Sequence, residues 1–178
     1  MKSGVPKSHG ALIVITGFMG SGKSTVARAL ASRLGSSTID LDREILKREG
    51  RTAQQIVEED GEPKFRDIET RILRNVLQDK FAGVISLGGG AWVLKGNRDL
   101  IAAAQGKSVW LDAPFDLCWQ RILSGDEGRP LAKNELEALD LYNKRRDAYA
   151  KASLRVQATK NKTADEIAAE IVGALERL

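Results

Sequence analysis

Residues 17–25, with the sequence GFMGSGKST, constrain this chain more than any other feature. They satisfy the pattern G-x-x-x-x-G-K-[ST], and they lie between an apolar run at 11–16 and a segment of helical periodicity at 26–34. Glycines allow successive N–H groups to point into one concavity, and the following helix adds the partial positive charge of its N-terminus. The sequence therefore predicts a strand, a phosphate-binding loop and a helix, in that order.

The side chains of this loop point to a nucleotide triphosphate and a metal ion. In this pattern Lys23 neutralises the β- and γ-phosphate oxygens, and the Ser24 hydroxyl binds Mg²⁺. The residues expected to bind ATP here are Gly20, Ser21, Gly22, Lys23, Ser24 and Thr25. The alternative is a glycine-rich turn without a ligand, but every fixed position of the motif and both flanks are correct.

Length and composition limit the class of protein. A chain of 178 residues suits one domain with a real core, here expected over 11–178 after a flexible tail at 1–10. The net charge of +4 comes from Lys and Arg scattered among Asp and Glu, which favours anionic small molecules over nucleic acid. No apolar stretch approaches the roughly 20 residues that span a bilayer. The lone Cys118 fits a reducing compartment, so a cytoplasmic protein without membrane partners is expected.

Short apolar strands alternate with helical segments along the chain. Strands are predicted at 11–16, 36–40, 84–87, 108–111 and 154–156, and helices at 26–34, 42–47, 51–60, 62–78, 98–104, 114–123, 133–152 and 163–178. Several strands are apolar throughout, which is typical of a parallel sheet covered by helices on both faces. Residues 124–128 lack apolar periodicity and contain two glycines, so a mobile loop is predicted there.

The residues that follow the strands are site candidates, because the carboxyl ends of parallel strands form the ligand crevice. If the chain stays extended through Asp40 and Asp42, both carboxylates point toward the mouth of the phosphate loop. One could then reach Mg²⁺ while the other accepts a hydrogen bond from an attacking hydroxyl. The alternative makes Asp42 only the N-cap of the next helix.

Two further strand ends are informative. Gly88, Gly89 and Gly90 let a backbone approach a ligand closely or adopt positive φ, and we expect their N–H groups to bind substrate. The run ending in Asp112 imitates the metal strand of many P-loop proteins. Because Asp40 and Asp42 also offer carboxylates, Asp112 is interpreted as a turn or cap residue, with a metal role left open.

Two arginines are predicted on inward-facing stripes of helices. Arg145 has apolar neighbours at helical spacing, whereas Arg146 points further away, and a buried arginine needs an anion such as a substrate carboxylate. Arg66 lies three residues before Glu69, which can hold it in one orientation. Together Arg66 and Arg145 suggest a clamp for an acidic substrate. The alternative for each is a structural ion pair.

Arg129 ends the glycine-containing loop, in the segment Arg129-Pro130-Leu131. A mobile segment that ends in arginine suits a phosphoryl-transfer lid, which closes, excludes water and brings positive charge to the transferring group. A surface loop with an ordinary charge is the alternative.

Taken together, these elements resemble the shikimate kinase family over nearly the whole chain after Gly10. The matching segments are residues 17–25, 40–42, 61–69, 88–90, 129–131 and 145–149. The phosphate loop alone is generic, but the ordered set is specific. The resemblance implies an α/β P-loop kinase fold of the nucleoside-monophosphate-kinase type, with a five-stranded parallel sheet ordered 2-3-1-4-5. It also implies a substrate-binding region at about 42–80 and a lid at about 123–132.

The resemblance further implies ATP-dependent phosphorylation of the 3-hydroxyl of shikimate, in the route to chorismate and the aromatic amino acids, by a monomer that uses Mg²⁺. Carried over by position, the catalytic residues would be Lys23, Asp42 and Arg129. The substrate would be bound by Asp42, Arg66, Gly88, Gly89, Gly90 and Arg145. Ser24 and Asp40 would hold the metal. Arg121 and Arg129 would join the ATP contacts, with Arg121 and the 159–162 loop on the adenine side.

Two departures from the family pattern concern the lid, where Asp126 and Glu127 replace basic or neutral residues and Ala132 replaces a frequent leucine. Two rival functions also stay open. One is a kinase for another small polyol acid, gluconate foremost. The other is a nucleotide-gated binding module without turnover, although such a switch has no need of an acid-binding clamp.

Overall fold

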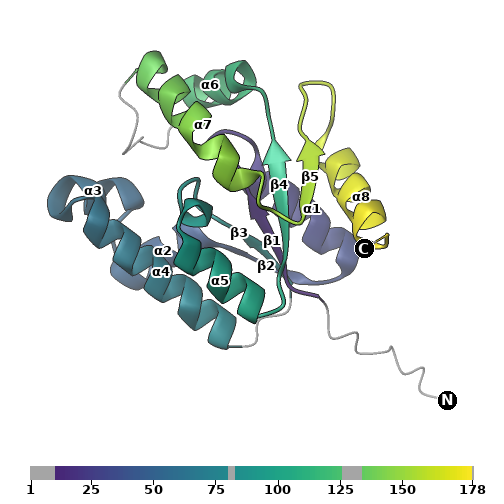
Figure 1. Cartoon of the computed structure of the whole chain (residues 1–178), viewed down its shortest axis with the longest axis horizontal. Coiled ribbons are helices and arrows are strands. Elements are labelled where there is room, and N and C mark those ends of the chain that lie inside the picture. Colours follow the sequence, from purple (N-terminus) through teal and green to yellow (C-terminus); the bar gives the residue numbers. More distant parts are fainter. Residues whose placement is uncertain (1–10, 80–82, 126–133, 178) are drawn as a thin grey trace.

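β1 (Ile13–Thr16) is the central strand of a five-stranded sheet in the computed structural model, which describes residues 11–79, 83–125 and 134–177 (Figure 1). The sheet is parallel throughout and has the order β2-β3-β1-β4-β5. The other strands are β2 (Ser37–Asp40), β3 (Gly83–Ser86), β4 (Lys107–Asp112) and β5 (Leu154–Gln157). The expected fold class and strand order are therefore confirmed.

Helices cover both faces of the sheet. They are α1 (Lys23–Leu34), α2 (Leu41–Glu49), α3 (Ala53–Asp60), α4 (Glu62–Gln78), α5 (Lys95–Ala103), α6 (Phe115–Ser124), α7 (Glu135–Tyr149) and α8 (Ala164–Leu175), with a short 3-10 helix η1 (Ala91–Val93). In Figure 1, α1 and α8 pack together on one side, while α4 and α5 cover the other. None of the helices in the described ranges is long and apolar enough to cross a membrane.

The helix bounds follow local signals. α4 occupies its predicted range, with Pro63 in the first turn, where the missing N–H costs no hydrogen bond. α7 is shorter than predicted, because the Asn134 side chain accepts a hydrogen bond from the backbone N–H of Glu137 and so caps its start. η1 was not predicted. The expected tail at 1–10 and most of the expected lid, residues 126–132, lie outside the described residues.

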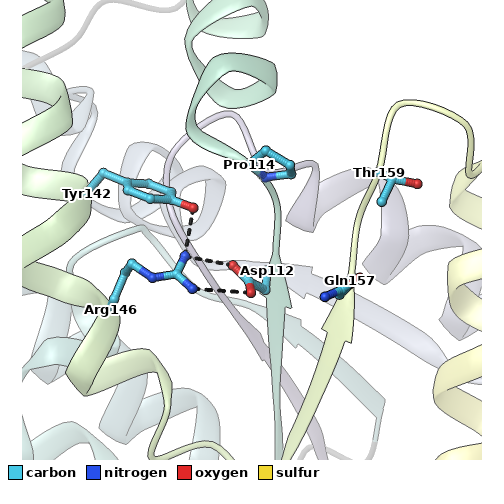
Figure 2. A pocket seen from close by; sticks show the side chains of 6 residues that line it. All are labelled: Asp112, Pro114, Tyr142, Arg146, Gln157 and Thr159. Atoms are coloured by element: carbon cyan, nitrogen blue, oxygen red, sulfur yellow. Dashed lines mark hydrogen bonds and ion pairs between the residues drawn. The ribbon is translucent and has the colours of Figure 1, made fainter.

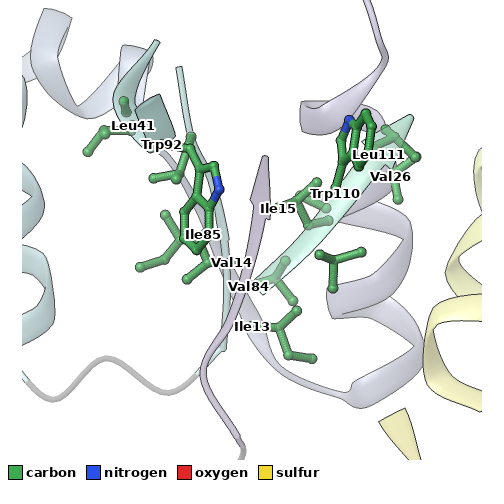
Figure 3. Packing of buried hydrophobic residues seen from close by; sticks show 14 of the residues in the cluster. Ile13, Val14, Ile15, Val26, Leu41, Val84, Ile85, Trp92, Trp110 and Leu111 are labelled. Carbon is green, nitrogen blue, oxygen red and sulfur yellow. The ribbon is translucent and has the colours of Figure 1, made fainter. Parts of the chain in front are cut away.

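The core lies on both sides of β1. Alternate residues of a strand face opposite sides, so Val14 and Ile85 face Trp92 while Ile13 and Ile15 face α1, which contributes Val26 (Figure 3). The described residues of β1, β3 and most of β4 are buried, which explains their continuous apolar sequence.

The strand order places the site. β1 pairs with β3 on one side and with β4 on the other, so the segments that leave these three strands meet at one edge of the sheet. This edge lies where chain connections diverge from a central strand, the usual ligand crevice of open parallel sheets. The phosphate loop, Gly88-Gly89-Gly90 and Asp112 all lie there.

Candidate active site

The glycines of the phosphate loop are required by close contacts and by positive φ. A β-carbon on Gly17, at φ 147°, would lie 2.6 Å from the carbonyl oxygen of Leu111, and one on Gly20, at φ 74°, would lie 2.5 Å from that of Cys118. The loop is therefore pressed between the end of β4 and helix α6, where no larger residue fits. Within it, the buried Ser21 hydroxyl has no hydrogen-bond partner among the described residues. An unpaired donor fits a loop built to bind phosphate.

Lys23 is buried at the start of α1, and its Nζ donates a 2.8 Å hydrogen bond to the carbonyl oxygen of Phe18. Burial lowers the pKa of its ammonium group, while the charges of Asp42 and Asp40 act in the opposite direction. The lysine therefore lies within the loop, close to both predicted carboxylates.

Asp40 and Ser24 are in direct contact, since the Ser24 hydroxyl donates a hydrogen bond to Oδ2 of Asp40. The Ser24 Oγ also lies 3.5 Å from that of Ser86. Mg²⁺ in kinase sites is commonly held by one or two protein oxygens, with phosphates and waters completing the shell. A hydroxyl and a carboxylate beside a phosphate loop fit that ion. No group of three or more His, Cys, Asp or Glu side chains within the described ranges forms a metal cluster.

The expectation that the chain stays extended through Asp42 is wrong. α2 begins at Leu41, and the residue that caps it is Asp40, whose Oδ1 accepts a 3.3 Å hydrogen bond from the backbone N–H of Arg43. Asp42 lies in the first turn of the helix, so it is not the cap either. It nevertheless faces the crevice, because a β-carbon on Gly88 would lie 2.9 Å from its Oδ1.

The three consecutive glycines make room for three different groups. None has positive φ, so the conformational explanation considered above does not apply. A β-carbon on Gly88 would meet Glu69 and Asp42, one on Gly89 would lie 3.3 Å from the backbone nitrogen of Met19, and one on Gly90 would lie 2.3 Å from Nη2 of Arg66. Close approach of charged side chains therefore explains the glycines at 88 and 90, and tight packing against the backbone of Met19 explains the glycine at 89.

Arg66 and Glu69 form the predicted ion pair, with 2.6 Å between Nη1 and Oε2. Arg66 also bonds Glu62. Burial by itself lowers the pKa of Arg66, but the two carboxylates outweigh burial, so this pKa is raised. Glu69 is fully buried, and its Oε1 has no hydrogen-bond partner among the described residues. Burial raises the pKa of Glu69 to about 7, against the opposing effect of Arg66.

Arg145 is buried on the inner face of α7, as its apolar neighbours predicted. It takes part in none of the ion pairs formed within the described ranges, and burial lowers the pKa of its guanidinium, partly offset by Tyr149. Arg145 and Arg66 line one cavity of about 300 Å³, together with Glu62, Pro63, Gly90, Val93 and Leu94. A buried cation in a cavity of this size is a site for a small anion.

The remaining predicted residues are placed as follows. Nη1 of Arg121 donates to the carbonyl oxygens of Gly20 and Ser21, so this arginine lies against the phosphate loop. Thr25 is exposed on the first turn of α1. Arg129 lies outside the described residues. Thr159, on the expected adenine-side loop, lines a second cavity of about 240 Å³.

The interpretation of Asp112 as a turn or cap residue is wrong. Asp112 is the last residue of β4, and the N-cap of α6 is Pro114. The Asp112 carboxylate instead bonds the guanidinium groups of Arg155 and of Arg146, the latter shown in Figure 2. Arg146 is less buried than Arg145, as predicted, with a side chain 33% exposed, and its Nη1 donates a 3.0 Å hydrogen bond to Oδ1 of Asp112. Glu62 was not among the predicted site residues, although its position four residues before Arg66 on a helix is a signal for a pair.

The sequence is similar to those of shikimate kinases. Residues 19–176 match the family model for shikimate kinase. The shikimate kinase of Persephonella marina is 39% identical over 163 residues, which cover 92% of this chain and 98% of that protein. The shikimate kinase of Geobacter sulfurreducens is 42% identical over 167 residues, 92% of this chain and 90% of that protein.

Solved structures with a similar fold include shikimate kinase from Acinetobacter baumannii in complex with shikimate, with a TM-score of 0.87 and 33% identity over 94% of both chains. A gluconokinase from Sinorhizobium meliloti has a TM-score of 0.67 and 20% identity, over 96% of this chain and 94% of that one. At that identity the likeness to the gluconokinase shows the fold alone.

Proposed function

This chain belongs to the shikimate kinase family, and on that premise we propose that it transfers the γ-phosphoryl group of ATP to the 3-hydroxyl of shikimate. The products are shikimate 3-phosphate and ADP, in the route to chorismate and the aromatic amino acids. Membership of the family identifies the reaction, and the residues of the crevice support the binding of both ATP and shikimate.

One observation carries the proposal: Gly89 lies between the phosphate loop and the buried guanidinium of Arg145, close to both. A β-carbon on Gly89 would lie 3.3 Å from the backbone nitrogen of Met19 and 3.5 Å from Nη1 of Arg145. A triphosphate in the loop and a carboxylate on Arg145 would therefore be neighbours in one crevice. Such proximity is what phosphoryl transfer between two bound molecules requires.

The arginines would bind the shikimate carboxylate. Arg145 has no carboxylate partner of its own within the described ranges, so its charge is available to a ligand. Arg66 is held by Glu69 and Glu62 in an orientation that faces the same cavity. Planar guanidinium groups suit a planar carboxylate, which explains a preference for an acidic substrate.

Asp42 would accept the proton of the attacking hydroxyl. In the step, an O–P bond forms between the 3-oxygen of shikimate and the γ-phosphorus, and the bond to the β–γ bridging oxygen breaks to release ADP. The hydroxyl proton passes to the Asp42 carboxylate, which lies beside Gly88 and close to Lys23. Lys23 would neutralise the phosphate oxygens once its hydrogen bond to Phe18 is exchanged for one to ATP.

Several parts of the proposal rest on the family pattern. Ser24 and Asp40 would hold Mg²⁺, which when bound neutralises phosphate charge. Arg129 would act as the lid arginine, and Arg121 would contribute to ATP binding on the adenine side. We also propose that the enzyme acts as a monomer in the cytoplasm and needs no nucleic acid or membrane partner.

A coupled assay of ADP release tests the function. Purified protein with ATP and Mg²⁺ should release ADP when shikimate is added and should show little turnover with gluconate or a nucleoside monophosphate. Turnover with either of these and none with shikimate would refute the proposal. Absence of turnover with all three, combined with nucleotide binding, would favour the nucleotide-gated binding module.

A further inference from the structure

Helix α7 carries Arg145 but has little apolar surface to hold it in place. Its buried residues are Ala138, Arg145 and Tyr149, with Leu141 and Tyr142 partly buried beside them. A helix is usually fixed by an apolar stripe, and this one buries a guanidinium in the middle of its inner face. The orientation of α7 must therefore depend strongly on directional contacts.

Two of these contacts fix the C-terminal end of α7 to the chain that follows β3. The Tyr149 hydroxyl donates to the carbonyl oxygen of Gly89, and Nε1 of Trp92 donates a 2.9 Å hydrogen bond to that of Ala148. Both partners follow β3. These contacts hold the last turn of the helix close to the substrate cavity.

Tyr142 in the middle of α7 and Arg146 in its last turn bond instead to the end of β4. The Tyr142 hydroxyl donates to the carbonyl oxygen of Ala113 at 2.9 Å, and Nη1 of Arg146 donates both to this hydroxyl, at 2.7 Å, and to Oδ1 of Asp112 (Figure 2). Among the described residues, Arg146 with Asp112 is the only ion pair that joins α7 to another element. Asp112 is thus the charged anchor of this helix.

Asp112 is itself rigidly placed. Its side chain is 9% exposed. Asp112 is the last residue of β4, so the strand fixes its backbone. Its Oδ2 accepts hydrogen bonds of 2.9 and 2.6 Å from Nε and Nη2 of Arg155 on β5. Both arginines also lie over the ring of Trp110, with 5.0 Å from Arg146 and 4.7 Å from Arg155 to its centroid. A carboxylate held this firmly can determine where Arg146 lies.

We propose that Asp112 is a positioning residue, which through Arg146 sets the rotation of α7 and so directs Arg145 toward the substrate carboxylate. Arg145 and Arg146 are consecutive residues of one helix, about 100° apart around its axis, so a rotation that moves one moves the other. The inference rests on the proposed function, since it takes Arg145 as the ligand of the shikimate carboxylate. It assigns Asp112 no contact with substrate, nucleotide or metal.

The test compares Asp112→Asn with Arg155→Gln. The second variant removes the other partner of the same carboxylate, an arginine that lies on β5 and not on α7. Asp112→Asn should raise the KM for shikimate at least fivefold, with smaller changes in kcat and in the KM for ATP. Arg155→Gln, which loosens Asp112 but leaves its bond to Arg146, should raise the KM for shikimate less than Asp112→Asn does. If Asp112 had only a structural role, Asp112→Asn would lower thermal stability and the active fraction without raising the KM for shikimate. If Asp112→Asn does not fold, Arg146→Gln gives the same comparison.

The Arg145→Ala background makes the test specific. If Asp112 acts through Arg145, Asp112→Asn should raise the KM for shikimate no further when Arg145 is already absent. An equal increase in both backgrounds, an increase with Arg155→Gln as large as with Asp112→Asn, or an unchanged KM in Asp112→Asn would overturn the proposal. Turnover of shikimate by the wild-type protein is measured first. Its absence would refute the proposed function, whereas wild-type turnover with no Asp112 effect refutes only the positioning role.

Discussion

Gly90 lies so close to Arg66 that a β-carbon added to it would be 2.3 Å from Nη2 and 2.6 Å from Cζ of the guanidinium. Gly90 has φ −104° and ψ −15°, a conformation that alanine adopts readily. Glycine at this position therefore leaves space for the side chain of Arg66, and its backbone angles do not require glycine.

Gly90→Ala should therefore displace the Arg66 guanidinium from the substrate cavity. We expect the KM for shikimate to rise about tenfold, equivalent to about 1.4 kcal/mol, because one partner of the carboxylate is misplaced. The KM for ATP should change little. Steady-state kinetics with each substrate varied in turn measure both. Gly96→Ala is a matched control, because nothing lies within 4 Å of the added carbon. Equal increases in both KM values for Gly90→Ala would contradict the assignment of Arg66.

The buried carboxyl group of Glu69 predicts a pH dependence of stability. Its pKa is raised from an ordinary 4.5 to about 7, mainly by burial. An acid whose pKa rises on folding stabilises the folded chain at low pH, and this contribution is lost as the pH rises through about 7. Relative to Glu69→Gln, the wild-type free energy of unfolding should fall between about pH 5 and pH 8.

Urea denaturation at several pH values measures this difference. Glu62→Gln is the control, because it removes a carboxylate from the same arginine at a half-exposed position. A wild-type stability that runs parallel to that of Glu69→Gln over the whole range would show that Glu69 stays ionised.

Asp40→Asn separates the two roles of this residue. Asparagine is as good an N-cap as aspartate, so the bond to the backbone N–H of Arg43 can persist and the free energy of unfolding should change by less than about 1 kcal/mol. The lost charge should raise the Mg²⁺ concentration for half-maximal activity about tenfold. Titration of activity with Mg²⁺ at fixed ATP checks this. An unchanged Mg²⁺ requirement would exclude Asp40 from the metal site.

Local signals made much of the fold predictable from the sequence. The bounds of α4 follow from Gly61, from Pro63 and from a strong apolar period, and the strand positions follow from short buried runs. The strand order came from the family resemblance and could not be obtained from periodicity. η1 was missed because three residues are too few to show a period.

The site was predictable where residues close in sequence act together. Arg66 with Glu69 is such a case, because helical spacing alone brings them into contact. Asp112 and Arg146 are 34 residues apart, and only the packing of α7 against the end of β4 joins them. The prediction of an extended chain through Asp42 was wrong because the sequence at 40–42 does not show that the strand ends at Asp40 and the helix begins at Leu41. Side chains two residues apart point to the same side in a strand but not in the first turn of a helix.

The central claim is that the phosphate loop and the arginine-lined cavity bind two substrates side by side but with separate ligands. Calorimetric titration of wild-type protein and Arg145→Ala, with ADP–Mg²⁺ and then with shikimate, tests it most directly. We predict that Arg145→Ala weakens shikimate binding on the order of 100-fold, as expected for loss of one or two charge-assisted hydrogen bonds, and leaves the affinity for ADP within about twofold. Equal loss of both affinities, or an unchanged affinity for shikimate, would contradict the account.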